Sequence, residues 1–104
     1  MNKKTLPPEI RRQIIIAQRS ELTEYYIYKK LSRTVKDQEN AKVLDKIAED
    51  ELSHYKIWVK YSGKEVEPSR WAIWKFYWIS RIFGLTFGIK LMEKGESQAQ
   101  VSYE

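Results

Sequence analysis

A carboxylate and an imidazole stand three residues apart in a strongly helical stretch of this 104-residue chain. They are Glu51 and His54, the latter the single histidine of the sequence. Residues three apart on an α-helix share one face. That face also carries apolar residues at helical spacing, namely Leu44, Ile47, Tyr55 and Trp58. Because an uncompensated carboxylate is costly on a core-facing stripe, this pair predicts a metal-binding or ion-paired site.

A second carboxylate, Glu21, interrupts the apolar stripe of the preceding helical segment. We expect one helix over residues 5–33 and another over residues 37–62, begun by Asp37 as N-cap and ended at Gly63. The short connection between them favours an antiparallel pair, in which the middles of the two helices face each other. Glu21 should therefore meet Glu51 and His54. Glu24, one turn further on, points either to the same interior or to solvent.

The amino-acid composition limits the kinds of metal site and partner that the chain can have. The chain has no cysteine, which excludes disulfides, cysteine-bound zinc and iron–sulfur clusters. Carboxylates and imidazole suit iron or manganese better than they suit soft-ligand chemistry. The formal net charge of +5 is spread along the chain without a recognition motif, so we expect no nucleic-acid binding. The N-terminal residues lack the apolar core of a secretion signal, and a cytoplasmic location is expected.

The second half of the chain begins with an aromatic-rich stretch. We expect a crossover over residues 63–79 and a third helix over residues 80–104, with the apolar residues of 71–91 forming part of the crossover and the buried start of that helix. The rival interpretation is a helix lying in a membrane interface, because basic residues interrupt the apolar run. The pair Gly84 and Gly88 would permit close approach of another helix. A shift of 75 residues places Glu21 on Glu96 and Tyr28 on Tyr103.

These motifs together resemble the rubrerythrin branch of the ferritin-like superfamily over nearly the whole chain. The aromatic crossover followed by residues 83–92 is similar to rubrerythrin-type domains that precede a vacuolar-iron-transporter-type membrane domain. The motifs that carry the resemblance are Glu21…Tyr28, Glu51-x-x-His54 and Gly95-Glu96-Ser97-Gln98-Ala99…Tyr103.

The resemblance implies an all-α, ferritin-like antiparallel bundle spanning residues 1–104 and a di-iron centre, with manganese or zinc as substitutes. It implies four iron ligands, which are Glu21, Glu51, His54 and Glu96. It also implies residues beside the centre that orient those ligands, which are Tyr28, Tyr103 and Glu24.

The chain departs from that family pattern in one respect. It holds no second Glu-x-x-His, so three helices of the four-helix fold are expected and the fourth is not. Either a longer protein supplies the fourth helix, or a second chain completes the site. We therefore expect a homo-oligomer, at least a dimer. The other expected partners are a membrane transporter domain and the inner membrane surface.

Three functions follow as hypotheses. The first is oxidation of ferrous iron, which is then passed to storage or to a membrane exporter. The second is peroxide reduction of the rubrerythrin kind, which would need a separate electron donor because the chain has no cysteine. The third is a non-catalytic interaction or membrane-surface module, in which Glu51 and His54 form a satisfied pair. A metal site would also make the metal-free protein less stable than the metal-bound form.

Overall fold

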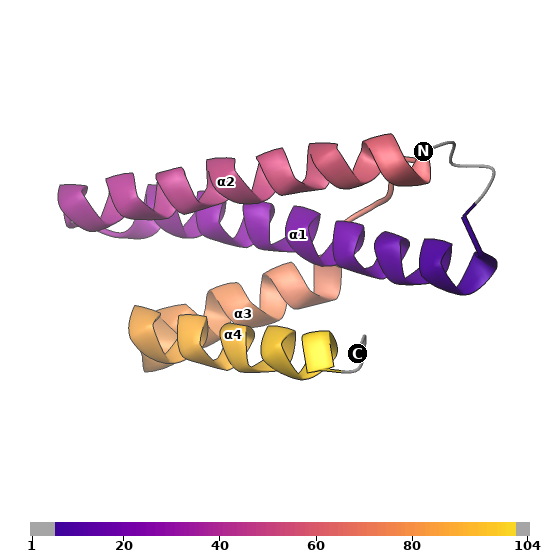
Figure 1. Ribbon diagram of the computed structural model, residues 1–104. Coiled ribbons are helices and arrows are strands. Elements are labelled where there is room, and N and C mark those ends of the chain that lie inside the picture. Colours follow the sequence, from indigo (N-terminus) through magenta and orange to yellow (C-terminus); the bar gives the residue numbers. More distant parts are fainter. Residues whose placement is uncertain (1–5, 102–104) are drawn as a thin grey trace.

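Four helices make up the part of the protein that the structure describes (Figure 1). The structure, a computed structural model, describes residues 6–101, and it describes only the backbone of residue 87 and residues 95–101. The helices are α1 (Pro8–Thr34), α2 (Gln38–Ser62), α3 (Arg70–Phe83) and α4 (Leu85–Val101). No strand occurs within this described range, which confirms the all-α prediction.

The first two helices form a long antiparallel hairpin (Figure 1). Pro8 occupies the first helical turn of α1, where its missing N–H costs nothing. The carboxylate of Asp37 accepts hydrogen bonds from the backbone N–H groups of Glu39 and Asn40 and so caps α2. Gly63 ends α2 in the left-handed conformation, at φ 69°. The predicted limits of both helices are confirmed to within a few residues.

The core lies along α1 and extends to all three other helices. At the seam with α2, Ala48 is fully buried and its small side chain lets the two helices approach closely. Ile27 and Leu31 of α1 are likewise almost completely buried. The remaining buried members of this cluster are Tyr28, Leu44, Tyr77 and Met92. In Figure 1, α1 separates α2 from the α3–α4 pair, so α1 is the element that both sides share.

The expected crossover over residues 63–79 is wrong in its extent. Only residues 63–69 are non-helical, and α3 begins at Arg70. The hydroxyl of Ser69 accepts a hydrogen bond from the backbone N–H of Ala72 and caps the helix. Of the residues that follow, Tyr77 is buried and Ile73 and Phe76 pack against the core, and this packing overrides their modest helix propensity.

The expected single helix over residues 80–104 is also wrong. Gly84 adopts φ 105°, a conformation open to glycine, and the chain reverses there between α3 and α4. The two helices then pack against each other, with Gly88 facing Ser80. A Cβ on Gly88 would lie 2.0 Å from Oγ of Ser80. The predicted close approach is therefore confirmed at Gly88, where it occurs within one chain, but not at Gly84, where a Cβ would have no other atom within 4 Å.

The apolar run of residues 71–91 is only partly covered. Tyr77 and Ser80 are buried against the rest of the protein, whereas Ile82 and Phe83 are 69% and 67% exposed. Burial of the start of the third helix was thus predicted incorrectly for these side chains. Across the described part of the chain, no helix combines the length and the apolar character needed to cross a membrane.

Candidate metal centre

Three side chains with metal-binding chemistry meet between the middles of α1 and α2. Glu21 belongs to α1, while Glu51 and His54 belong to α2. The Nδ1 atom of His54 lies 3.6 Å from Oε1 of Glu21 and 3.7 Å from Oε1 of Glu51. One ligand atom from each residue lies within 4.8 Å of the other two. The antiparallel pairing of the helices brings them together as the sequence predicted, and their role as ligands stays a prediction.

The three groups differ in exposure. The side chains of Glu21 and Glu51 are 19% and 17% exposed, whereas that of His54 is 52% exposed. The expectation that His54 faces the core is therefore wrong. Consecutive residues on a helix lie about 100° apart, and Tyr55 occupies the buried direction, so His54 is turned to the rim of the helix seam. The two carboxylates of the site are therefore mostly buried, and the imidazole lies at the solvent-exposed edge of the site.

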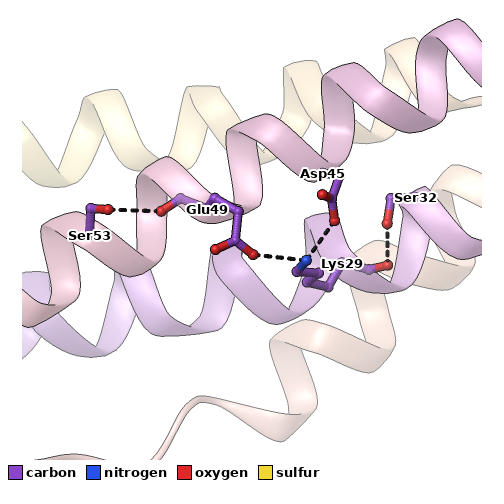
Figure 2. A network of polar contacts seen from close by, with 5 residues as sticks. All are labelled: Lys29, Ser32, Asp45, Glu49 and Ser53. Carbon is purple, nitrogen blue, oxygen red and sulfur yellow. Dashed lines mark hydrogen bonds and ion pairs between the residues drawn. The ribbon is translucent and has the colours of Figure 1, made fainter.

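An ion-pair network fixes the position of α2 along α1 on one side of the site (Figure 2). The ammonium group of Lys29 lies 2.6 Å from Oδ1 of Asp45 and 2.8 Å from Oε2 of Glu49. Its hydrogen bond with Asp45, and then that with Glu49, raise the pKa of Lys29 above its ordinary value. Because Glu49 is two residues before Glu51, this contact also fixes the position along the axis of α1 at which Glu51 contacts that helix.

A second polar contact holds the two helices on the opposite side of the site. The side chain of Gln18 is fully buried three residues before Glu21. Its Oε1 accepts a hydrogen bond of 2.8 Å from the Ser62 hydroxyl, and its Nε2 donates to the carbonyl of Lys64. The carboxylates of the site thus lie between two polar interhelical contacts. Sequence reasoning missed both contacts, although Gln18 stands out as an amide inside an apolar stripe.

Glu24 is buried. Of the two directions predicted for its side chain, the one toward solvent is therefore wrong. Its side chain is 5% exposed, and its Oε2 atom is inaccessible to solvent. It lines a cleft of about 310 Å³ on the other side of α1, together with Thr23, Phe76 and Met92. Glu24 does not belong to the group of ligand atoms formed by the other three residues. Its burial nevertheless places a carboxylate one helical turn from Glu21.

The remaining predicted site residues are placed as follows. Tyr28 is 4% exposed and belongs to the core cluster. Glu96 lies on α4 by its backbone, but its side chain falls outside the described part of the structure. Tyr103 also lies outside the described residues. The ligand role of Glu96 and the orienting roles of both tyrosines remain predictions.

The donor geometry matches a divalent cation after a small contraction. Ligand bonds of about 2.1 Å place neighbouring donor atoms roughly 3.0 Å apart in an octahedral shell and about 3.4 Å apart in a tetrahedral one. The distances of 3.6 and 3.7 Å from His54 Nδ1 exceed these values by less than 1 Å. These two distances are compatible with one shared ion, whereas the donor atoms of Glu21 and Glu51, which lie within 4.8 Å of each other, would have to approach further. Two carboxylates and one imidazole form a donor set suited to iron, manganese or zinc.

Fold and site together define an all-helical protein with a carboxylate–histidine group suited to a divalent cation. No known protein family, curated protein or solved structure matches the chain.

Proposed function

We propose that this protein is a ferritin-like iron-binding protein that oxidises ferrous iron. The observation that supports the proposal most directly is the meeting of Glu21, Glu51 and His54 within 4.8 Å between two adjacent helices. Glu-x-x-His on one helix opposite a Glu on its neighbour is the ligand pattern of carboxylate di-iron bundles. In this proposal ferrous iron is the substrate, dioxygen takes up the electrons, and the oxidised iron passes to storage or to a membrane exporter.

The burial gradient suits capture of a cation from water. The half-exposed imidazole of His54 is accessible to an ion in solution, whereas the oxygens of Glu21 and Glu51 lie deeper. Partial burial strengthens the attraction between carboxylates and a cation, since the effective dielectric constant is lower there than in water. Two carboxylates also favour the ferric over the ferrous charge state, because the attraction grows with the charge of the ion. The residues thus both collect ferrous iron and favour its oxidation.

These three ligands are half of the set that a di-iron centre uses. In our proposal the other ligands come from a second chain of the homo-oligomer, because α4, which carries Glu96, lies on the other side of α1 from this seam. The exposed side of His54 leaves room for such ligands to approach. A second Glu-x-x-His hairpin placed against the first would supply a matching carboxylate pair and imidazole.

A purely structural explanation competes with metal binding. A protonated His54 could act as a cation that neutralises the two carboxylates, which its distances of 3.6 and 3.7 Å would also allow. Such an ion pair at a half-exposed position contributes little to stability. The purely structural explanation does not account for the meeting of three ionisable groups between two helices that polar contacts hold on both sides of the site.

Anaerobic titration with ferrous iron, combined with solution mass, tests the proposal. We expect binding of about one iron per chain in a dimer, followed by oxygen consumption when air is admitted. Glu51→Gln and His54→Ala should lose both signals, whereas Glu39→Gln, at the exposed start of α2, should keep them. Wild-type protein that binds no iron under these conditions would refute the metal role. Binding without oxygen consumption would refute the oxidase role and leave the binding role standing.

A further inference from the structure

The outer face of α3 carries a stripe of large apolar side chains. Trp71, Trp74, Trp78 and Ile82 follow at helical spacing and are 64%, 55%, 44% and 69% exposed. The indole rings of Trp71 and Trp74 stack with their centres 5.2 Å apart. The opposite face of the same helix, with Tyr77 and Ser80, is buried against the rest of the protein. The stripe is therefore additional to what the fold needs for its own core.

The charges around this stripe are of one sign. No acidic residue occurs between Arg70 and Met92, and the charged residues of that stretch are Arg70, Lys75, Arg81 and Lys90. Arg70 and Arg81 are exposed on α3 beside the tryptophans. Glu67, which precedes α3, is an acidic residue near the stripe, and it lines a cleft together with Trp74, Lys30 and Arg70. The surface that presents the tryptophans is therefore basic.

Two basic side chains of α3 contact aromatic rings of the same helix. The guanidinium group of Arg81 lies over the ring of Tyr77, 5.9 Å from its centre, and donates a hydrogen bond to the Tyr77 hydroxyl. The ammonium group of Lys75 lies 4.8 Å from the centre of the Phe76 ring. Such contacts restrict long basic side chains that would otherwise sample many rotamers. By helical position, Arg81 and Lys75 thus lie on the two flanks of α3, one on each side of the tryptophan stripe.

We propose that the outer face of α3 docks on an anionic lipid membrane, with the helix lying along the surface. Tryptophan prefers the level of the lipid headgroups, where its ring is in apolar surroundings and its N–H remains hydrated. Lysine and arginine beside it attract anionic headgroups. A helix of 14 residues is about 21 Å long, which suits a helix lying in the interface.

A second copy of the chain fits this face less well than a lipid surface. Pairing two such faces would bring Arg70, Lys75 and Arg81 of each chain near those of the other, and α3 offers no carboxylate to neutralise them. Like charges placed together across an interface weaken association. An anionic membrane supplies both the negative charge and the apolar depth that the face requires.

Docking in this way leaves the candidate metal centre accessible. The centre lies at the seam of α1 and α2, and α2 lies on the other side of α1 from α3 and α4 (Figure 1). His54 would remain exposed to water while α3 rests on lipid. Membrane docking is thus independent of metal binding, and an experiment can refute either proposal without refuting the other.

Flotation with vesicles of neutral phosphatidylcholine, with and without anionic phosphatidylglycerol, tests the proposal on the full chain. We expect binding to the anionic vesicles that weakens as salt increases, with a blue shift of tryptophan emission. The triple variant Trp71→Ala/Trp74→Ala/Trp78→Ala should lose binding. The triple variant Arg70→Gln/Lys75→Gln/Arg81→Gln should bind about 100-fold more weakly, at roughly fivefold for each cation.

Matched control variants separate docking through α3 from general attraction of a basic protein. Lys42→Gln/Lys56→Gln/Lys60→Gln removes three exposed charges from α2, and Val43→Ala/Ile57→Ala removes two exposed apolar side chains from the same helix. Both variants should keep most of the binding, and circular dichroism should show that every variant is folded. Equal loss in the α2 and α3 charge variants would overturn the proposal.

The remaining outcomes also decide the question. Wild-type protein that does not float with anionic vesicles would overturn lipid docking. A solution mass of a dimer or larger, reduced to a monomer by the tryptophan variant but unaffected by vesicles, would assign the face to a second copy instead. Capture of an acidic protein in place of vesicles would assign it to a protein partner.

Discussion

Replacing Glu51 by glutamine should remove most of the stabilisation of the fold by ferrous iron. A ligand at 100 times its dissociation constant stabilises a protein by about 2.7 kcal/mol. For a chain of 104 residues, the entropy of unfolding is roughly 0.22 kcal/mol/K, so this corresponds to a rise in melting temperature of about 12 °C. Glutamine keeps the shape of the side chain, which is 17% exposed, and removes only its charge.

The expected loss can be estimated in the same way. Removing one of three ligands should raise the dissociation constant by about 100-fold. At the same iron concentration the remaining stabilisation would be about 0.4 kcal/mol, or roughly 2 °C. The experiment is thermal unfolding followed by circular dichroism under anaerobic conditions, with and without ferrous iron. Manganese and zinc would be compared in parallel.

Glu39→Gln provides the control, because it removes an exposed carboxylate at the start of the same helix. Its melting temperature should rise with iron as much as that of the wild type. A wild-type melting temperature that iron leaves unchanged would refute the reasoning. So would a Glu51→Gln variant that keeps the whole increase, since the carboxylate would then not be a ligand.

Three further changes test the fold around the site. Ile27→Ala should lower the free energy of unfolding by about 2–5 kcal/mol in urea denaturation, because the side chain is 1% exposed in the core; a cost below this range would mean that the core collapses around the gap. Gly63→Ala should cost about 1 kcal/mol in the same assay, because φ there is 69°, and an unchanged midpoint would contradict the left-handed cap. Lys29→Met should lower the melting temperature, because it removes the ion pairs with Asp45 and Glu49. The size of this decrease should stay constant from neutral pH to about pH 10. The reason is that the pKa of Lys29 is raised in the folded state, and the pairing is lost only when the pH rises above that pKa. A difference that shrinks by pH 9 would count against this pairing.

The hairpin and the meeting of the three candidate ligands were predictable because local signals determine them. Asp37 and Gly63 mark the limits of α2 by capping chemistry that acts within a few residues. Helical periodicity then places Glu21 and Glu51 at the middles of two helices joined by a short loop. An antiparallel pair has no other way to arrange those positions.

The second half of the fold depends on information that periodicity does not carry. The direction of the chain after Gly84 follows from a single φ of 105°, and a continuous helix has the same pattern of apolar residues. The exposure of His54 follows from which neighbour takes the buried direction, and Tyr55 takes it. The contact between Gln18 and Ser62 joins residues 44 apart in sequence, so only the assembled tertiary structure reveals it.

The position of α1 between the other helices divides the protein into two packed units. The α1–α2 hairpin is held by its apolar seam and by the polar contacts of Lys29 and Gln18. The α3–α4 pair packs on the other side of α1, where Ser69 N–H donates to the Thr23 hydroxyl. Such a pair can open as a local unit while the hairpin stays folded. A disturbance that reaches α3 therefore need not move the carboxylates between α1 and α2.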